Sequence, residues 1–375
     1  MKLTGIAWSR YRIPFVQPYE TARGRVTHRT GYIVRAMTDV GVAGLGEAAL
    51  DPSAPEEDSA AIEPHVRILA EAALREGARL DEAMEPYLHG DDAMRAANCA
   101  IETAVADAGC RWAGAPLASM FSGRPEGSAP GPVVSVEVNA TVANQRTGVA
   151  AAAALAAKAS GFGTVKLKVG MEPTIEAEVE RVQVIRDVLG PDIRLRLDAN
   201  GAWSEAVAID LMRELEVFDI ELIEQPVSDI EALGRLRSVS AIPLAADEAA
   251  YDFASGQRAL AHADVLVLKP MRLGGPTVAR YLAQYANAAG LEAFVTTTID
   301  TGVGTAMALH VAASLPGSGL AHGLATASLL ESDLLAQPLR LERGRLYLPE
   351  SPGLGVDLDE AAMTRYGDGW QEVTA

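Results

Sequence analysis

Cysteine is nearly absent from this 375-residue chain. Its only two cysteines, Cys99 and Cys110, lie in the alanine-rich run Ala93–Ala113, whose apolar spacing predicts a helix. Two cysteines inside one such run are expected to be buried free thiols, rather than a disulfide or part of a metal site. Free thiols are typical of proteins that work in a reducing compartment.

Long hydrophobic runs are also missing. The sequence has no stretch of about 18 uncharged apolar residues, and its first ten residues contain no apolar signal-peptide core. Basic residues are outnumbered, with 32 Lys and Arg against 50 Asp and Glu, so the net charge is -18. This charge argues against nucleic acid and anionic membranes as partners. We therefore expect a soluble, cytoplasmic protein.

A large core is within reach, because 49% of the residues are hydrophobic. Residues 1–50 alternate apolar and polar positions, which predicts a small antiparallel sheet, and residues 55–122 have helical spacing. Residues 17–29 between the strands are polar and basic, and they are interpreted as a mobile loop over a site. The Gly-, Pro- and Ser-rich stretch 123–132 is the expected domain boundary. Residues 1–125 are thus predicted to form an α+β domain.

From residue 133 a strand and a helix alternate repeatedly, which predicts a parallel α/β barrel. We expect a (β/α)7-8 TIM-type barrel over residues 132–335, with the segment 336–375 packing back on the first domain. The expected helices include 143–160 and 176–189. The expected strands lie near residues 133–139, 164–169, 193–198, 221–225, 243–247, 264–269, 292–298 and 322–326.

Charged residues stand at the ends of five consecutive expected strands. They are, in chain order, Lys166 and Lys168, Asp198, Glu224, Asp247 and Lys269. Lys166 and Lys168 alternate with apolar residues, so both point to one face of their strand. The carboxyl ends of barrel strands converge on the face where substrates bind, so we expect all six side chains to meet there. If Lys166 and Lys168 were only a solvated strand edge, the other four charged residues at strand ends would remain unexplained.

Three carboxylates on neighbouring strands would repel one another, and a divalent cation resolves this repulsion. An all-oxygen site favours Mg²⁺, with Mn²⁺ also possible, over Zn²⁺, which prefers His or Cys. Three carboxylates and one divalent cation together leave one negative charge at the site. An anionic ligand therefore needs the lysines as well, and the pattern predicts a site for a small-molecule carboxylate.

These motifs together resemble the enolase superfamily, in the muconate-lactonizing-enzyme subgroup, over nearly the whole chain; the Gly274-Gly275 pair belongs to the same pattern. The resemblance implies a capping domain built from both termini, and Mg²⁺-dependent removal of a proton alpha to a carboxylate through an enediolate. Lys168 would be the base, with a pKa lowered by Lys166 and partial burial. Lys166 would donate a hydrogen bond to the enediolate. Lys269 would either return a proton on the opposite face or stabilise the intermediate.

Two later segments, 295–304 and 321–330, resemble o-succinylbenzoate synthases, which are hydroxyl-rich at the seventh strand and carry His-Gly-Leu-x-Thr at the eighth. That resemblance implies dehydration of 2-succinyl-6-hydroxy-2,4-cyclohexadiene-1-carboxylate in menaquinone biosynthesis. The loops 15–30 and 50–60 are expected to set the substrate. The candidate substrate-binding residues are Asn200, Thr297, Thr298, Asp300, His322 and Arg25.

Several of these candidates have a second interpretation. Asn200 either orients Lys166 or Asp198 or makes a turn. His322 either binds substrate or is structural. Arg25, with Arg23, either reaches a substrate carboxylate or is solvated with its loop. Asp300 stands where the subgroup commonly has Glu, which puts its support of Lys269 in question.

Other activities fit the same lysines. Dipeptide epimerases of the subgroup usually carry an Asp-x-Asp pair at the eighth strand for the substrate ammonium group. Residues 322–326 carry no carboxylate, which disfavours dipeptide epimerase. The same pattern also fits an N-acylamino acid racemase, a muconate-type cycloisomerase or a non-catalytic binding barrel. Barrels of this family often form homo-oligomers. The resemblance therefore implies that a second copy of this chain is a possible partner.

Overall fold

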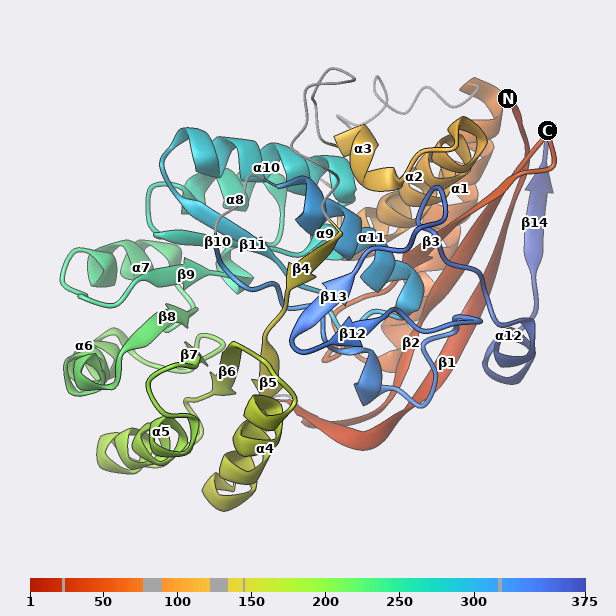
Figure 1. Cartoon of the computed structure of the whole chain (residues 1–375). Coiled ribbons are helices and arrows are strands. Elements are labelled where there is room, and N and C mark those ends of the chain that lie inside the picture. Colours follow the sequence, from red (N-terminus) through yellow and green to blue (C-terminus); the bar gives the residue numbers. More distant parts are fainter. Residues whose placement is uncertain (22–23, 77–89, 122–133, 144–145, 316–318) are drawn as a thin grey trace.

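The structure is a computed structural model that describes residues 1–21, 24–76, 90–121, 134–143, 146–315 and 319–375. Its strands form three sheets: a four-stranded sheet in the order β14-β1-β2-β3, a seven-stranded parallel sheet in the order β11-β10-β9-β8-β7-β6-β5, and a small sheet in the order β12-β13-β4. Figure 1 shows the parallel sheet curled into an incomplete barrel with helices outside it, and the four-stranded sheet standing beside it. This is the predicted α/β barrel with an α+β capping domain.

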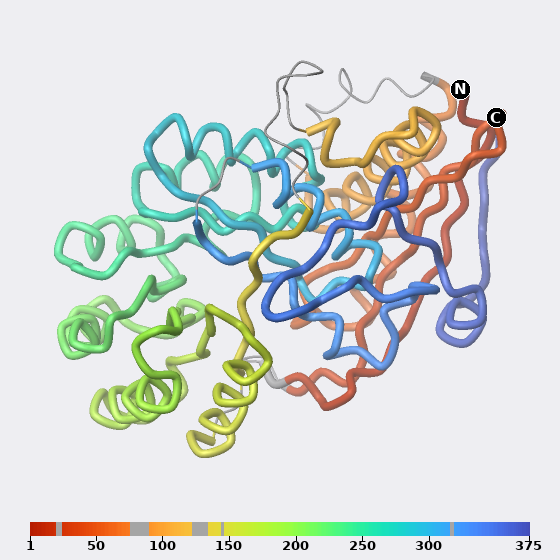
Figure 2. The backbone as a smooth tube through the Cα atoms, viewed as in Figure 1, coloured from red at the N-terminus to blue at the C-terminus, as the bar shows by residue number. Residues whose placement is uncertain are grey.

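The four-stranded sheet joins both ends of the chain. Strands β1 (Leu3–Thr21), β2 (Gly24–Thr38) and β3 (Ala43–Ala48) are antiparallel neighbours. Strand β14 (Gln371–Thr374) pairs with the outer edge of β1, with Gly5 opposite Thr374. The two termini therefore lie side by side, as Figure 2 shows.

The sequence predicts a loop at 17–29, and that prediction is wrong for the described residues, because β1 extends over 17–21 and β2 begins at Gly24 and covers 24–29. The pairing shifts register between Pro14 and Tyr19 and then resumes with Tyr19 opposite Val26. Aromatic and β-branched residues such as Phe15, Tyr19 and Val26 favour strands, and here they outweigh the polar, basic composition. Arg23 lies outside the described residues.

Helices α1 (Ile62–Glu76) and α2 (Asp92–Ala113) cover the capping sheet, and the short helix α3 (Leu117–Phe121) packs against α2 and α11, so the helices expected in this region are confirmed. Helix α2 begins after Asp91, whose side chain accepts a hydrogen bond from the Met94 amide. Its alanine-rich face lets β3 approach closely: a Cβ added to Gly46 would lie 2.0 Å from the Ala100 carbonyl oxygen. Both cysteines are free and buried, as predicted.

The barrel strands and helices alternate as predicted. The strands are β5 (Ala140–Val142), β6 (Thr164–Lys168), β7 (Arg194–Asp198), β8 (Ile220–Glu224), β9 (Leu244–Ala246), β10 (Val265–Leu268) and β11 (Glu292–Val295). The helices are α4 (Thr147–Ala159), α5 (Ile175–Leu189), α6 (Glu205–Leu215), α7 (Ile230–Arg237), α8 (Phe253–Ala259), α9 (Pro270–Leu273), α10 (Pro276–Ala288) and α11 (Gly302–Ser314).

The first expected barrel strand, 133–139, is placed differently. Its described part contains β4 (Ser135–Glu137), which pairs antiparallel with β13 (Arg345–Tyr347), beside β12 (Leu341–Glu342). The chain then enters the barrel at β5, three residues later. The tail also carries helix α12 (Glu360–Tyr366).

The two ends of the curled sheet are joined by the short segment at His322 and Gly323, where the eighth strand is expected. Val138 forms an isolated parallel bridge with His322, and Thr296 forms another with Gly323. Backbone hydrogen bonds run on both sides, from the His322 amide to Glu137 and from the Gly323 amide to Val295. The eighth unit is therefore a pair of bridges rather than a full strand.

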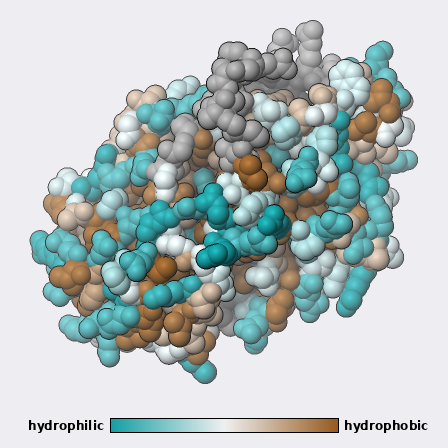
Figure 3. Space-filling view, in the orientation of Figure 1, coloured by the Kyte–Doolittle hydropathy of each residue, from teal (hydrophilic) through white to brown (hydrophobic). Residues whose placement is uncertain are grey.

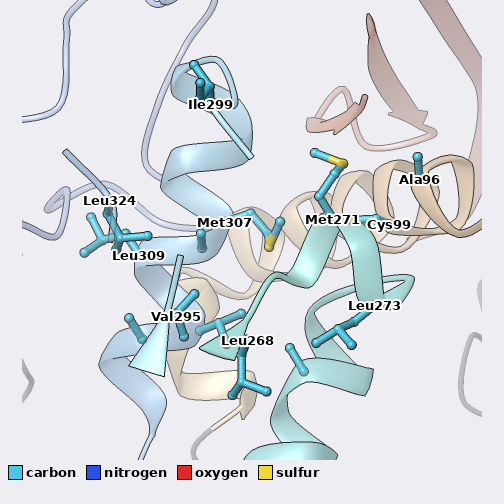
Figure 4. Packing of buried hydrophobic residues seen from close by; sticks show 14 of the residues in the cluster. Ala96, Cys99, Leu268, Met271, Leu273, Val295, Ile299, Met307, Leu309 and Leu324 are labelled. Atoms are coloured by element: carbon cyan, nitrogen blue, oxygen red, sulfur yellow. The ribbon is translucent and has the colours of Figure 1, made fainter. Parts of the chain in front are cut away.

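One apolar core runs through both parts of the molecule, because Ala96 and Cys99 of α2 belong to the same buried cluster as Met271 and Leu273 of α9 (Figure 4). The face seen in Figure 3 is mainly hydrophilic, with apolar residues scattered over it. No helix in the described residues is long and apolar enough to cross a bilayer. We propose the domain division 1–125, 132–335 and 336–375; its expected boundary, 123–132, lies outside the described residues.

Candidate active site

The strand-end side chains meet because their strands pair in register. In the parallel sheet Lys168 lies opposite Asp198, and Asp198 lies opposite Glu224. The Lys166 Nζ donates a 2.6 Å hydrogen bond to Glu224 Oε1 and lies 2.9 Å from Asp198 Oδ2. All three acids are almost fully buried, with at most 1% of each residue exposed. Lys166, Asp198 and Glu224 therefore lie together at the predicted end of the sheet.

The two remaining lysines lie at the two flanks of the carboxylates. Lys269 follows β10, and its Nζ donates a 2.6 Å hydrogen bond to Asp247 Oδ2. Lys168 ends β6, and its Nζ donates to Asn200 Oδ1 at 2.7 Å and lies 3.9 Å from Asp198 Oδ2. Strands β7, β8 and β9 separate the two lysine-bearing strands.

Burial and mutual repulsion strongly shift the carboxyl groups. Burial raises the pKa of Glu224 to about 8; the Lys166 charge opposes this rise, but the neighbouring Asp198 and Asp247 charges add to it. Burial also acts on Asp198, but two lysines and the Asn200 amide outweigh it and lower its pKa to about 2. An uncompensated negative charge is therefore less favourable at Glu224 than at Asp198.

The prediction that the pKa of Lys168 is lowered is wrong for this arrangement. Burial does lower it, and so does the Lys166 charge, but attraction to Asp198 outweighs both and the net pKa is raised. The Lys269 pKa is raised as well, because the Asp247 charge outweighs the effect of burial. Both lysines are ammonium groups here, each fixed by a carboxylate or an amide oxygen.

The donor chemistry of the three acids fits a hard divalent cation. Glu224 Oε2 and Asp247 Oδ1 are buried and have no hydrogen-bond partner, which is costly for carboxylate oxygens unless a cation or water satisfies them. As the side chains lie, however, the described residues hold no group of three acidic, His or Cys side chains close enough for a metal ion. The other oxygens of Asp198, Glu224 and Asp247 are turned toward Lys166 and Lys269 instead.

Asn200 makes the turn after β7 and also bonds to Asp198, as the two interpretations expected, but the lysine that its side chain contacts is Lys168 rather than Lys166. Its backbone has a φ of 45°, in the left-handed region that Asn tolerates, and its amide donates to Asp198 Oδ1 at 3.0 Å. Its side-chain oxygen accepts from Lys168, and its side-chain nitrogen donates to Glu248 Oε1 at 2.8 Å. Burial beside Asp247 raises the pKa of Glu248 to about 7.

Thr297, Thr298 and Asp300 are buried after β11, where they bond to other protein groups. The Thr297 hydroxyl pairs with that of Thr326 at 2.9 Å. Thr298 donates to Asp300 Oδ1 at 2.5 Å through its hydroxyl and at 3.2 Å through its amide. The Asp300 carboxylate lies 3.7 Å from the Arg29 guanidinium, so it faces the capping domain.

His322 and Arg25 are not brought to the carboxylate cluster. His322 Nδ1 accepts a hydrogen bond from the Val295 amide at 3.0 Å, so the ring is built into the barrel wall. Burial and the Arg196 charge lower its pKa to about 3. Arg25 is exposed on β2 and lines a cavity of about 410 Å³ between the hairpin and residues 50–56.

The sequence interpretation missed a buried network that ties the capping domain to the end of β11. Glu47 accepts hydrogen bonds from the Tyr11 hydroxyl at 2.6 Å, from the Thr301 hydroxyl at 2.6 Å and from the Gly304 amide at 2.8 Å. Arg29 donates to the Ile299 and Leu50 carbonyl oxygens. Glu47 belongs to an alternating strand pattern and lies on the face that this pattern predicts to be buried. A charged residue on that face is the one signal that could have identified it.

Tyr251 is a second residue that the sequence interpretation missed. Its hydroxyl accepts from Lys269 Nζ at 3.4 Å, and that ammonium lies 5.1 Å from the centre of its ring.

Gln225 is a third residue that the sequence interpretation missed. Its side-chain oxygen accepts from the Asp247 and Ala249 amides at 2.8 and 3.1 Å, so it fixes the turn that carries Asp247. Its place in the Glu-Gln-Pro sequence directly after β8 was the signal that could have found it.

Comparisons with known proteins agree with this geometry. Residues 148–362 match the family model of the enolase C-terminal domain-like group, and residues 8–121 match that of the mandelate racemase / muconate lactonizing enzyme N-terminal domain. The o-succinylbenzoate synthase of Thermobifida fusca is 39% identical over 237 residues, which are 61% of this chain and 73% of the relative. The chloromuconate cycloisomerase of Cupriavidus pinatubonensis is 31% identical, over 94% of this chain and 95% of its own length. The solved L-Ala-D/L-Glu epimerase of Bacillus subtilis, in a substrate-liganded complex, has a TM-score of 0.82 and 30% identity, over 95% of this chain and 99% of that structure.

Proposed function

The chain belongs to the enolase superfamily, in its muconate-lactonizing-enzyme subgroup, and on that premise we propose that it removes the proton alpha to a carboxylate through an enediolate. The observation that supports this most is the placement of Lys168 and Lys269 on either flank of three buried acids. We propose Asp198, Glu224 and Asp247 as the ligands of Mg²⁺, or of Mn²⁺.

Each lysine has a separate task in this proposal. Neutral Lys168 takes the alpha proton, and Asn200 keeps its amine directed into the site. Lys166, buried between Asp198 and Glu224, donates to the carboxylate oxygen that gains charge. Lys269 faces the intermediate from the β10 side with a positive charge.

Asp198, Glu224 and Asp247 would hold a divalent cation, which would supply positive charge for the developing enediolate and would offset the Asp198 charge that raises the pKa of Lys168. Everything else in the step is done by the protein. The acids are buried and the three lysine side chains are 14–22% exposed, so their hydrogen bonds are largely shielded from water and act in a lowered dielectric.

The specific reaction that we propose is o-succinylbenzoate synthesis. Lys168 takes the proton alpha to the ring carboxylate of 2-succinyl-6-hydroxy-2,4-cyclohexadiene-1-carboxylate, hydroxide leaves the neighbouring carbon, and the ring becomes aromatic. The 39% identity to an o-succinylbenzoate synthase supports this choice. It is also supported by residues 322–326, which offer no carboxylate to a substrate ammonium group. The two free, buried thiols are consistent with a cytoplasmic site of action.

Two further reactions have specific support. Cycloisomerisation is favoured by the match to a chloromuconate cycloisomerase over nearly the whole chain, and epimerisation by the fold likeness to a dipeptide epimerase. Epimerisation would use a lysine on each face of the substrate. N-acylamino acid racemisation uses the same pair of lysines.

The deciding experiment incubates the purified protein and Mg²⁺ with the cyclohexadiene substrate and follows the aromatic product by absorbance. Parallel reactions follow lactone formation from muconate, and alpha-proton exchange in D₂O for dipeptides and N-succinyl amino acids. Aromatic product at the highest kcat/KM supports the synthase. Fast exchange on a dipeptide without aromatic product would replace it with the epimerase.

Two lysine variants separate an enzyme from a binding barrel. Lys168→Ala and Lys269→Ala should fold normally by circular dichroism, and Lys168→Ala should lose dehydration. A protein that binds these carboxylates but converts none of them, with both lysines intact, would contradict the proposed chemistry.

A further inference from the structure

Tyr251 lies directly after the turn that carries Asp247, and it contacts the lysine that follows the next strand. Its ring interacts with two cations: the Lys269 ammonium is 5.1 Å from the ring centre and the Arg272 guanidinium 4.3 Å. Its hydroxyl accepts from Lys269 Nζ at 3.4 Å. A cation over an aromatic face is attracted to it, and more strongly where water is excluded.

We propose that Tyr251 is a positioning residue for Lys269, holding its ammonium on the β10 side of the site. This inference rests on the proposed function for its catalytic consequence, but not for the contact itself. Asp247 also accepts a hydrogen bond from Lys269, at 2.6 Å. Because Asp247 is a proposed cation ligand, its oxygens are shared, whereas Tyr251 has no such second task.

Tyr251 is well suited to this role because it stays a neutral phenol. Burial raises its pKa, and the Asp247 charge raises it further, although Lys269 opposes them. The hydroxyl therefore accepts from the lysine without adding a negative charge beside the three acids. The ring can fix the ammonium without competing for a proton.

The capping domain holds the other cation of this group in place. Arg272 Nη1 lies 2.9 Å from Asp92 Oδ2 at the start of α2, and the Arg272 carbonyl oxygen accepts from Arg95 Nε at 2.8 Å. One turn further along α2, Asn98 Nδ2 donates to the Gly274 carbonyl oxygen at 2.7 Å. One face of α2 therefore binds the segment that follows Lys269.

Backbone conformation and packing together explain the Gly274-Gly275 pair, because Gly274 also has a positive φ, of 98°. Gly275 has a φ of 139°, and a Cβ on it would lie 2.0 Å from Glu102 Oε2 of α2. Glu102 Oε1 accepts from the Thr277 amide at 3.0 Å, at the start of α10. In Figure 4, Met271 lies beside Cys99 of α2. Arg272 is thus fixed from the capping side, and both it and Lys269 contact the Tyr251 ring.

The test compares Tyr251→Leu, which removes the ring, with Tyr251→Phe, which removes only the hydroxyl. Exchange of the alpha proton in D₂O is measured on both enantiomers of an N-succinyl amino acid, and Lys168→Ala and Lys269→Ala assign each face to its lysine. Tyr251→Leu should slow exchange on the Lys269 face roughly tenfold, because a small misplacement of a reacting group is costly. Exchange on the Lys168 face should not change, and Tyr251→Phe should recover part of the loss.

Tyr281→Leu is the matched control, because this exposed ring on α10 also carries an arginine, Arg280, at 5.3 Å. Tyr281→Leu should leave the rate of alpha-proton exchange unchanged on both faces of the substrate. Equal slowing of both faces in Tyr251→Leu, or no slowing of either, would overturn the positioning role.

A second measurement keeps this result separate from the proposed function. If the wild type neither exchanges an alpha proton nor forms the aromatic product, the proposed chemistry fails. In that case, and also for a synthase that dehydrates without exchange, crystal structures of the wild type and Tyr251→Leu still test the contact. Lys269 Nζ should leave its place beside Asp247 in the variant. An unmoved Lys269 would show that Tyr251 does not position it.

Discussion

Lys168 donates a 2.7 Å hydrogen bond to the side-chain oxygen of Asn200, and the opposite end of that amide donates to Glu248. The amide can satisfy both partners in only one orientation, because its oxygen accepts and its nitrogen donates. Glu248 therefore fixes Asn200, and Asn200 in turn fixes the proposed base.

Asn200→Gly tests this relationship without straining the backbone, since glycine readily adopts the φ of 45° found here. Lys168 loses its amide partner, and we expect kcat for the proposed reaction to fall roughly tenfold. Steady-state kinetics provide the measurement, with thermal unfolding to verify the fold. A normal kcat in a folded variant would show that the amide does not orient the base.

Asp247→Asn tests the cation site by stability rather than by turnover. A ligand that binds only the folded state raises the melting temperature by mass action, so Mg²⁺ should raise Tm of the wild type. The rise should disappear in Asp247→Asn, because the site loses a charged oxygen ligand. Scanning calorimetry with added Mg²⁺ and after EDTA treatment measures Tm of both proteins. Asp210→Asn, an exposed carboxylate on α6, is the control and should keep the full rise.

Glu47→Gln tests the link between the capping domain and the barrel. Glu47 accepts from Tyr11, from Thr301 and from the Gly304 amide, and these partners are all donors. A glutamine would turn an NH₂ group toward donors, so we expect a loss of about 2–3 kcal/mol in the free energy of unfolding. Tyr11→Phe removes one bond and should cost about 1 kcal/mol. Chemical denaturation measures both; equal stability of Glu47→Gln would mean that the network is not stabilising.

The parallel strands and the residues at their ends could be predicted from sequence because each signal is local. An apolar run ending in Asp198, Glu224 or Lys269 marks both a strand and the position of a side chain on the barrel face. The contacts made across domains leave no such local mark. Tyr251 follows a turn, and its interest arises from Lys269 and Arg272, which come from the next strand and helix.

The prediction of a loop at 17–29 and the prediction of a lowered pKa for Lys168 were wrong for physical reasons of the same kind. Polar composition at 17–29 indicated a loop, but pairing with the neighbouring strand was decisive. Lys166 and burial do act on Lys168 in the predicted direction, yet Asp198, 30 residues away in the chain, outweighs them. Both depend on which segments become neighbours, and sequence spacing alone does not supply that.

His310 makes a pH-dependent contribution to stability that can be measured apart from catalysis. The ring is fully buried on α11; its Nδ1 accepts from the Ala118 amide at 3.1 Å, so Nε2 carries the proton toward the Leu354 carbonyl oxygen at 3.2 Å. Burial lowers its pKa from 6.5 to about 4, so the unfolded chain binds a proton more readily between these values. The contribution is complete above about pH 6.5 and is lost as the pH falls toward 4, up to about 3 kcal/mol. His310→Asn keeps an acceptor near Nδ1 and does not titrate. Urea unfolding from pH 7 to 4.5 should therefore show a shallower loss of stability in the variant, and parallel curves for the two proteins would contradict a buried neutral His310.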